Sequence, residues 1–398
     1  MLLSSRHAVY PSTFFCFSFF SLKLVNIALV IMFPQRSSQV YRMPQTHQPP
    51  PALELAENLE YPNLNVADLN ARLENLSPRL HDCWDSIAIN EQQHIALATN
   101  RREGRHWWGM FFGYARSQVN HMSVDSADFK LQAEHTVNIL RYADNDVLLV
   151  ALGDTRLQAW STYSKVRNSD QPYCLFRVGE ASVHPTPISH LSVFKANKQR
   201  AVSASADGTL NVWDLSSADL SSCYHTRSSH LDKLTGLMTP SASAEKFVTC
   251  DRGGCARLWD IRAAALSSSC LFDDDSHLLS FTCGAWAAPT ELQGNNYVYL
   301  GDFDGKVHTV DIRVPRKLAE TIEYFDKGHV SQLLINGPHL AAMSNLPASV
   351  KVSNVNPGHK VIYTHENTHS RLTDAIWTDE CTLLTIGHGR KLVTHSLK

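Results

Sequence analysis

The chain lacks several features that would place it quickly in a common functional class. Its 36 Lys and Arg nearly balance its 38 Asp and Glu, so no global positive field suits it to nucleic acid. It contains no GxSxG motif, so no sequence signature indicates a serine hydrolase. It also has no Gly-rich phosphate loop, so none indicates nucleotide binding. Its 9 cysteines are not spaced like those of a disulfide framework, and Cys250 and Cys255 are not a CxxC pair. We therefore expect free thiols in a reducing compartment, and neither a cofactor nor a metal.

Long apolar runs are also scarce, with one exception near the N-terminus. Residues 12–34 are almost entirely apolar, broken mainly by Lys23, and are long enough for a signal anchor or a membrane span. However, the one glycosylation sequon, at 75–77, is followed by proline, and Met43 opens a flexible Pro- and Gln-rich stretch. We interpret residues 1–42 as an upstream extension that the usual product lacks. A real anchor, which would imply a membrane, and a cleaved signal are the alternatives.

The most informative feature present is an internal repeat. NVWDL at 211–215 and RLWDI at 257–261 place two tryptophans 259 − 213 = 46 residues apart. Stepping a similar interval in both directions along the chain gives five further equivalent positions, at Phe112, Trp160, Val310, Ser353 and His395. The mean period, (395 − 112)/6 or about 47, matches the four-stranded blades of a propeller.

The repeat predicts the organisation of the whole chain. From about residue 80 onward, short β-rich runs alternate with turn residues, and no long amphipathic helix appears. We predict an all-β, seven-bladed WD-repeat propeller over 80–398 with a flexible N-terminal extension. Residues 1–42 form the apolar extension, and 43–79 form a Pro-rich segment and a closing segment. Residues within about 62–80 should close the ring beside the C-terminal strand, because propellers remove exposed edges in this way.

Side chains at fixed places within the units point to a structural hydrogen-bonded set. In WD repeats a His, a Ser or Thr, a turn Asp and a Trp bond together, fixing the turn while the Trp packs between blades. Several units open with a His, namely His135, His184, His230, His329 and His369. The unit of Trp259 has Gly253 at the turn position, and the unit of Ser353 has Pro347. The residues we assign to the structural set are Asp154, Trp160, His184, Ser203, Asp207, Trp213, Trp259 and Asp304.

Two motifs suggest other chemistry. HENTH at 365–369 fits the zincin pattern HExxH, which requires a helix to bring both histidines to one zinc ion. The preceding VIYT favours a strand and Asn367-Thr368 favours a turn, so we interpret the motif as a propeller loop. The acidic run at 273–275 could suggest a cation or a basic partner, but a solvated loop is the simpler interpretation. We assign no catalytic residues.

The first unit contains a candidate partner-binding motif. Arg105, His106, Trp107 and Trp108 are consecutive, and neighbouring residues in a strand point to opposite faces. Both rings are therefore not expected to be buried in one core, although the N-terminal segment could cover them. An exposed Trp beside an Arg is typical of an interface hot spot. We take Arg105, Trp107 and Trp108 as the candidate partner-binding residues.

Four segments resemble one branch of WD-repeat proteins, the methylosome protein 50 family. They are GRHWWGMFF at 104–112, AVSASADGTLNVWDL at 201–215, YVYLGDFDGKVHTVDIR at 297–313 and RLTDAIWTDECTLLTIGHGRKLVTH at 371–395. The last two are the most specific, because their blades are atypical of WD repeats. The resemblance spans about 80–398 and suggests a divergent member of the kind found in insects.

The resemblance implies a function that spacing alone does not show. Members of this family are non-catalytic partners of the type II, or symmetric, protein arginine methyltransferase, and dock on its N-terminal barrel as a hetero-octamer. They help to present Arg-rich substrates such as Sm proteins and histones, and no direct contact with nucleic acid is expected.

Arg105 and Trp107 match family residues that insert into the methyltransferase. Trp108 stands where the family usually has a small residue, which puts the insertion geometry in doubt. The resemblance implies a cytoplasmic protein, with a nuclear pool left open.

Two other hypotheses predict different observations. A generic WD scaffold or substrate adaptor, for example in a ubiquitin ligase, would bind through its top-face loops and bury its first blade. A metalloprotease acting through His365 and His369 would have a helix at 362–370 and bound zinc.

Overall fold

The computed structural model describes the chain from residue 83 to residue 397. Within that span it leaves out 104–105, 122–125, 165–172, 217–219, 228, 263–266, 275, 277, 290–295, 356–358, 367–370 and 389–391. The described secondary structure consists of strands and one short 3-10 helix, η2 (Arg116–His121). No helix in the described part of the chain is long and apolar enough to cross a membrane, and residues 12–34 lie outside that part.

The strands form seven antiparallel sheets, and each strand pairs with the next along the chain. The first blade comprises β1 (Ser86–Ile89), β2 (His94–Glu103), β3 (His106–Ala115) and β4 (Phe129–Ala133). The second comprises β5 (Val137–Asp144), β6 (Val147–Leu152), β7 (Arg156–Ser164) and β8 (Tyr173–Ser182). The third comprises β9 (Ile188–Val193), β10 (Arg200–Ser205), β11 (Leu210–Asp214) and β12 (Ser221–Thr226).

The remaining blades repeat this order. The fourth comprises β13 (Leu234–Met238), β14 (Lys246–Asp251), β15 (Ala256–Asp260) and β16 (Ser267–Phe272). The fifth comprises β17 (Phe281–Trp286), β18 (Tyr297–Asp302), β19 (Lys306–Asp311) and β20 (Leu318–Glu323). The sixth comprises β21 (Val330–Asn336), β22 (His339–Asn345), β23 (Ala348–Asn354) and β24 (Val361–Glu366). The seventh comprises β25 (Leu372–Trp377), β26 (Thr382–Gly387) and β27 (Leu392–Ser396).

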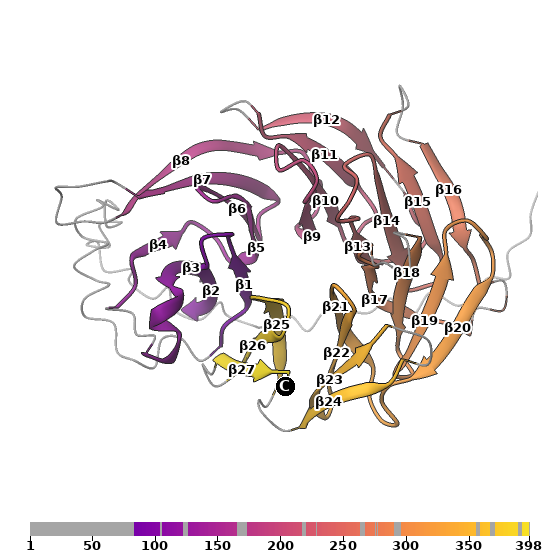
Figure 1. Cartoon of the computed structure of the whole chain (residues 1–398). Helices are drawn as coiled ribbons and strands as arrows, with labels where there is room; N and C mark the ends of the chain where they lie inside the picture. Colours follow the sequence, from indigo (N-terminus) through magenta and orange to yellow (C-terminus); the bar gives the residue numbers. More distant parts are fainter. Residues whose placement is uncertain are drawn as a thin grey trace, which may run out of the picture. The chain divides into compact units, whose positions relative to one another are not determined.

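The seven sheets close into a ring. The first strand of each blade contacts the first strand of the next blade, in the order β1, β5, β9, β13, β17, β21, β25 and back to β1 (Figure 1). All seven positions found by stepping along the repeat lie in the third strand of their blade, at Phe112, Trp160, Trp213, Trp259, Val310, Ser353 and His395. The predicted seven-bladed all-β propeller is therefore confirmed.

The core lies between neighbouring blades. Second strands such as β10 and β18 are buried along almost their whole length, whereas outer strands such as β12 and β24 are largely exposed. One apolar cluster joins Leu149 of the second blade to Trp213 of the third, and another joins Phe194 of the third to Trp259 of the fourth. Trp213 and Trp259, the tryptophans of the two WD motifs, thus pack between blades, as the repeat predicts.

Polar side chains on the innermost strands also link neighbouring blades. The hydroxyl of Thr235 donates to the carbonyl oxygen of Phe281, in the next blade, at 2.9 Å. Thr373 donates in the same way to the carbonyl of Trp84. Equivalent bonds to the next first strand start from Asn138 and Thr282. Buried strand carbonyls accept these bonds, which orient each sheet against the next.

Where the last and first blades meet, donors from several blades converge on one carboxylate, that of Asp374 on β25. It accepts hydrogen bonds from the Ser86 hydroxyl and the Ile87 backbone N–H, both at 3.1 Å. The side-chain amide of Gln332 donates to it at 2.8 Å, and Arg141 lies 3.5 Å away. Asp374 therefore connects the sixth, seventh, first and second blades. The β1 and β25 strands lie side by side in Figure 1.

The outer edge of the seventh blade differs from the others, because its sheet has three strands in the described part of the chain. A backbone bridge pairs Cys83 with His388, and the Trp84 N–H donates to the Gly387 carbonyl at 3.4 Å. The chain thus enters the propeller beside the last blade. The predicted closing segment at 62–80 lies outside the described residues, so its pairing stays a prediction.

Replacing Asp374 should destabilise the ring strongly. In Asp374→Ala, the donors of Ser86, Ile87 and Gln332 lose their shared acceptor, and we expect a loss of about 3 kcal/mol in the free energy of unfolding. Urea denaturation measures this loss. Asp379→Ala is the control, because it removes a surface carboxylate paired with Arg116 and should cost less than about 1 kcal/mol. Equal losses in the two variants would contradict the closing role of Asp374.

Deleting residues 62–80 should expose the edge of β27 and lower solubility. An unpaired edge strand offers free N–H and C=O groups to other chains, and this favours aggregation. Size-exclusion chromatography of the deletion variant beside the intact chain measures the effect. A fully folded, monodisperse deletion product would count against this closure.

Candidate protein-binding surfaces

The first blade carries a hairpin that extends beyond its sheet. Its strands β2 and β3 have 10 residues each, whereas the corresponding strands of blades three to seven have 5 to 7. The inner neighbour β1 pairs with β2 only over 95–98, and the outer neighbour β4 pairs with β3 only over 109–113. The rest of the hairpin is therefore a two-stranded ribbon that leaves the blade.

The two tryptophans of this ribbon point in different directions, as expected for neighbours in a strand. Trp108 is partly buried against the cluster that contains Met110 and Tyr114, and the Arg101 guanidinium lies 5.9 Å from its ring centroid. Trp107 is 54% exposed. Arg105, the third candidate, lies outside the described residues. The ribbon thus presents one large aromatic side chain to solvent, beside a second ring that anchors it.

The third blade contains the set of His184, Ser203 and Trp213 in direct contact. Trp213 Nε1 donates to the Ser203 hydroxyl at 2.8 Å, and that hydroxyl lies 2.6 Å from His184 Nε2. Because the indole can only donate, Ser203 can accept from it and donate to the imidazole. Asp207 reaches His184 through Thr209 rather than directly, since Thr209 lies 2.8 Å from His184 Nδ1 and 2.9 Å from Asp207. Thr209 is a member that the sequence analysis missed.

The fourth blade builds the same set with a carboxylate at a different place. Asp251, at the end of β14, lies 2.8 Å from His230 Nδ1, while His230 Nε2 lies 2.6 Å from the Thr249 hydroxyl. Trp259 Nε1 donates to Thr249 at 2.7 Å. The sequence analysis considered this unit degenerate because Gly253 stands at the turn position. A search at the last residue of the second strand, two residues earlier, would have found Asp251.

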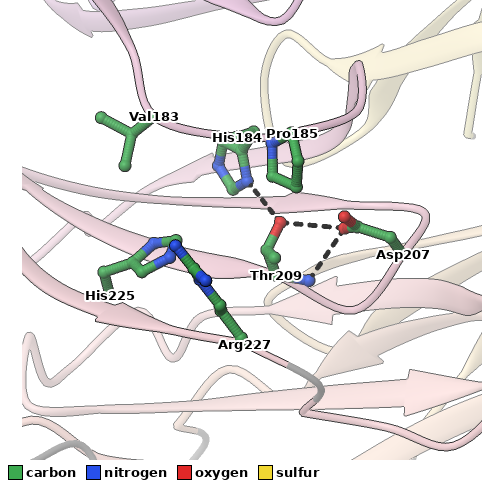
Figure 2. A pocket seen from close by; sticks show the side chains of 7 residues that line it. All are labelled: Val183, His184, Pro185, Asp207, Thr209, His225 and Arg227. Atoms are coloured by element: carbon green, nitrogen blue, oxygen red, sulfur yellow. Dashed lines mark hydrogen bonds between the residues drawn. The ribbon is translucent and has the colours of Figure 1, made fainter.

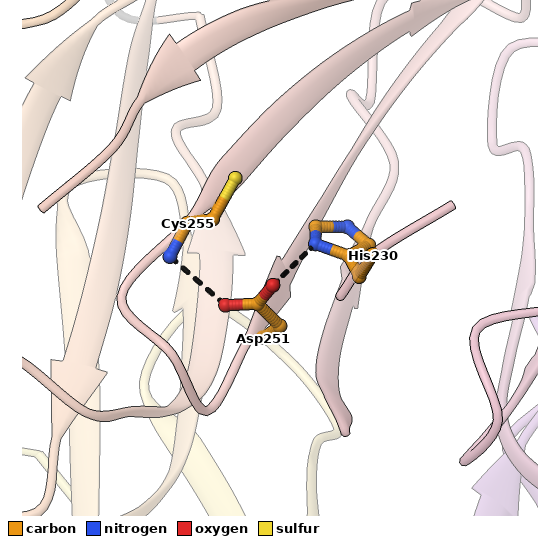
Figure 3. Close-up of side chains that lie close together, drawn as sticks. All are labelled: His230, Asp251 and Cys255. Carbon is orange, nitrogen blue, oxygen red and sulfur yellow. Dashed lines mark hydrogen bonds and ion pairs between the residues drawn. The ribbon is translucent and has the colours of Figure 1, made fainter. Parts of the chain in front are cut away.

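His230, Asp251 and Cys255 also form a group whose ligand atoms lie within 4.8 Å of one another (Figure 3). Hydrogen bonds already explain this group. Both ring nitrogens of His230 have partners, and Asp251 also accepts the Cys255 backbone N–H at 2.9 Å. Burial raises the pKa of the Cys255 thiol to about 11, whereas a metal would need the thiolate. We therefore interpret the group as part of the blade and not as a metal centre.

The fifth and second blades depart further from the predicted set. In the fifth, Asp302 lies 2.8 Å from His308, a residue of the third strand, whereas the predicted Asp304 is exposed and does not take this role. The prediction for Asp304 was therefore wrong, because the carboxylate again stands at the end of the second strand. In the second blade Asp154 lies 3.3 Å from His135, but Trp160 donates to Gln158 instead of joining them.

A shallow pocket of about 500 Å³ lies at the edge of the third blade. Three of its polar groups belong to the hydrogen-bonded set just described, since His184, Thr209 and Asp207 bond to one another along its wall (Figure 2). The residues that line it are Val183, His184, Pro185, Asp207, Thr209, His225 and Arg227. The Asp207 carboxylate and the His184 imidazole are thus already used to hold the turn, and the His225 imidazole lies 3.2 Å from the Asn211 side-chain oxygen.

The structure gives a simple account of the described parts of the two motifs that suggested other chemistry. His365 and Glu366 of the HExxH motif lie in the strand β24, so the helix that a zincin requires does not form there; His369 lies outside the described residues. In the acidic run, Asp273 is exposed but Asp274 is buried. Asp274 accepts the Leu279 N–H at 2.6 Å. The interpretation of a solvated loop was therefore wrong for Asp274, which holds the loop in shape.

Comparisons with known proteins identify one close relative and many structural neighbours. The chain is 79% identical over 367 residues to Protein valois of Drosophila melanogaster, covering 92% of this chain and 100% of the relative. No model of a known protein family matches it. Solved structures with the same fold include Sqt1 of Chaetomium thermophilum bound to the N-terminus of ribosomal protein L10 (TM-score 0.61, 13% identity, 80% of this chain and 85% of that one). A chain of the COPII outer coat vertex on membranes is similar (TM-score 0.62, 14% identity, 80% and 85%).

The buried His184 should make stability depend on pH. Burial lowers its pKa to about 4, against the opposing effect of Asp207, whereas an unfolded His titrates near 6.5. The unfolded state then binds more protons, so this contribution is present above pH 6.5 and is lost as the pH falls toward 4. At pH 5 the loss amounts to about 2 kcal/mol.

Urea unfolding at pH 7.5 and pH 5.0 tests this dependence. His184→Gln, which cannot titrate, should show a smaller stability difference between the two pH values than the wild type. His388→Gln, at an exposed position of the last blade, is the control and should keep the wild-type difference. An unchanged difference in His184→Gln would show that other groups cause the pH dependence.

Proposed function

The chain belongs to the Valois family, the insect branch of the methylosome protein 50 proteins, and from this we propose that it is a non-catalytic subunit of the methylosome. It binds the type II protein arginine methyltransferase and helps to present Arg-rich substrates for symmetric dimethylation. The 79% identity to Protein valois, over the whole of that relative, is the observation that carries the proposal. The propeller fold provides the protein-interaction scaffold that such a role requires.

The extended hairpin of the first blade supports a specific docking surface. It leaves the sheet as a two-stranded ribbon, and Trp107 near its tip is 54% exposed. A large aromatic side chain on a projecting element is typical of a residue that fills a pocket of a partner. We propose that Trp107, together with Arg105, inserts into the methyltransferase. The partly buried Trp108 supports the ribbon from its other side and makes fewer contacts with the partner.

The assembly and its substrates follow from the family resemblance. We propose a hetero-octamer with four copies of each protein, and Sm proteins and histones as presented substrates. The protein itself performs no catalysis, and it acts in the cytoplasm with access to a nuclear pool. The exposed Trp107 favours this proposal over the generic WD scaffold or substrate adaptor, which would bind through its top-face loops.

Trp107→Ala should disrupt binding to the methyltransferase without unfolding the propeller. Loss of a hot-spot aromatic costs about 2 kcal/mol, which weakens binding about thirtyfold. Co-purification of residues 43–398 with the methyltransferase of the same species, followed by size-exclusion chromatography, measures this. We expect a large stable complex for the wild type and a folded, unbound protein for the variant.

Phe176→Ala is the matched control, because Phe176 is an aromatic residue of similar exposure (51%) on the second blade. It should leave the complex intact. If wild-type protein forms no complex, the chain is a WD scaffold for another partner. If Trp107→Ala binds as tightly as the wild type, the docking surface lies elsewhere.

A further inference from the structure

Blades four to six expose an arc of apolar side chains at one end of the ring. Because successive strands are antiparallel, the loops between blades and the turns between second and third strands emerge at the same end. Leu231 and Leu278 lie in the loops before β13 and β17, and Leu346 lies in the turn between β22 and β23. Phe303 lies in the turn between β18 and β19 and is 61% exposed. None of these four side chains belongs to the surface proposed above.

The loops that carry this arc touch one another in blades five and six. The Phe303 N–H donates to the Ser280 carbonyl at 3.0 Å, which joins its turn to the loop of Leu278. On the other side, a Cβ atom built on Gly328 would lie 2.1 Å from the Leu346 carbonyl oxygen, so the two backbones are in close contact. The surface from Leu278 to Leu346 is therefore continuous.

An aromatic pair lies at the middle of this surface. The rings of Phe303 and His329 are nearly parallel, at 8°, with centroids 5.7 Å apart. Burial lowers the pKa of His329, and the nearby Arg371 lowers it further, so the imidazole is neutral at neutral pH. The pair thus presents a flat aromatic surface without a positive charge of its own.

Two exposed carboxylates flank the aromatic pair. Asp304 follows Phe303 in the same turn, and Asp326 lies in the next loop, which is fixed by N–H bonds from Tyr324 and Phe325 to the Gly305 carbonyl at 3.0 Å. Neither carboxylate has an ion-pair partner among the described residues. By contrast, Asp154 in the equivalent turn of the second blade pairs with Arg156 at 2.6 Å. The exposed Lys327 beside Asp326 and the exposed Arg371 near His329 offset part of the negative charge.

We propose that this face of blades five and six docks an extended, arginine-bearing segment of a partner protein. One guanidinium lies over Phe303 and pairs with Asp304 and Asp326. A guanidinium suits this surface better than an ammonium, since it is planar, more weakly hydrated, and able to stack on a ring while it bonds to carboxylates. Leu278 and Leu346 contact the residues on either side. The inference rests on the proposed function, because it identifies where an Arg-rich substrate would be held.

Fluorescence anisotropy on the free full-length chain tests the proposal. The probes are a labelled Arg-Gly repeat peptide and a Lys-Gly peptide of the same length and charge. We expect the arginine peptide to bind at least about fivefold more tightly, which corresponds to about 1 kcal/mol. Phe303→Ala and the double variant Asp304→Asn/Asp326→Asn should each weaken its binding by at least that factor. Lys327→Glu should tighten it.

Phe176→Ala again provides the matched control, because it removes a comparably exposed aromatic ring from another blade and should not change binding. Thermal melting of each variant shows that the propeller is intact. Equal binding of the two peptides, or unchanged binding in Phe303→Ala, would overturn the proposal. Loss of binding in Leu278→Ser and Leu346→Ser but not in the aspartate variants would also overturn it, in favour of an apolar partner.

The outcome is separable from that of the proposed function. Peptide binding is measured without the methyltransferase, whereas complex formation is measured by co-purification. Phe303→Ala should lose the peptide and keep the complex, and Trp107→Ala should do the reverse. A wild-type chain that forms the complex but does not bind the arginine peptide would overturn this inference alone.

Discussion

The ring depends on the carboxylate of Asp374, which joins its two ends. A propeller must hold its last blade against its first, and at that junction donors from several blades converge on one acceptor. Ser86 and Ile87 of the first blade bond to it from one side, and Gln332 of the sixth blade bonds from the other. A carboxylate suits this place because it can accept several hydrogen bonds at once. The other neighbouring blades meet through apolar clusters and single side-chain hydrogen bonds, such as that of Thr235.

Within each blade, the geometry of the hydrogen-bonded set matters more than the identity of its members. In the third blade a Thr transmits the bond from the turn Asp to His184. In the fourth, Asp251 at the end of the second strand bonds to His230 directly, and in the fifth Asp302 holds His308 from within the blade. Each arrangement satisfies a buried imidazole, which is the physical requirement. His184, His230 and His308 are thus explained by this need.

The rigid ring supports two separate surfaces with different chemistry. The ribbon of the first blade projects Trp107 away from the sheet and suits insertion into a pocket. The loops of blades five and six form a broader surface, in which the Phe303 ring is accompanied by carboxylates. One surface can hold an enzyme while the other holds its substrate, because they belong to blades that do not adjoin. The function proposed above, a non-catalytic subunit of a methyltransferase, would use both surfaces.

The sequence by itself determined the fold class, the number of blades and the place of every third strand, because a period of about 47 residues reflects local strand and turn preferences. It also indicated His184, Ser203 and Trp213 as one set, and a Trp pair divided between two faces. Only the tertiary structure decided that Asp251 and Asp302 replace the expected turn residues, and that Asp374 closes the ring. It alone brought Phe303 beside His329. Asp251 and Asp302 stand at the same place in the repeat, the last residue of the second strand, but the repeat alone does not show which side chain the carboxylate meets. Asp374 and the pair of Phe303 and His329 contact residues of other blades or loops, so only the packing of these elements against one another creates those contacts.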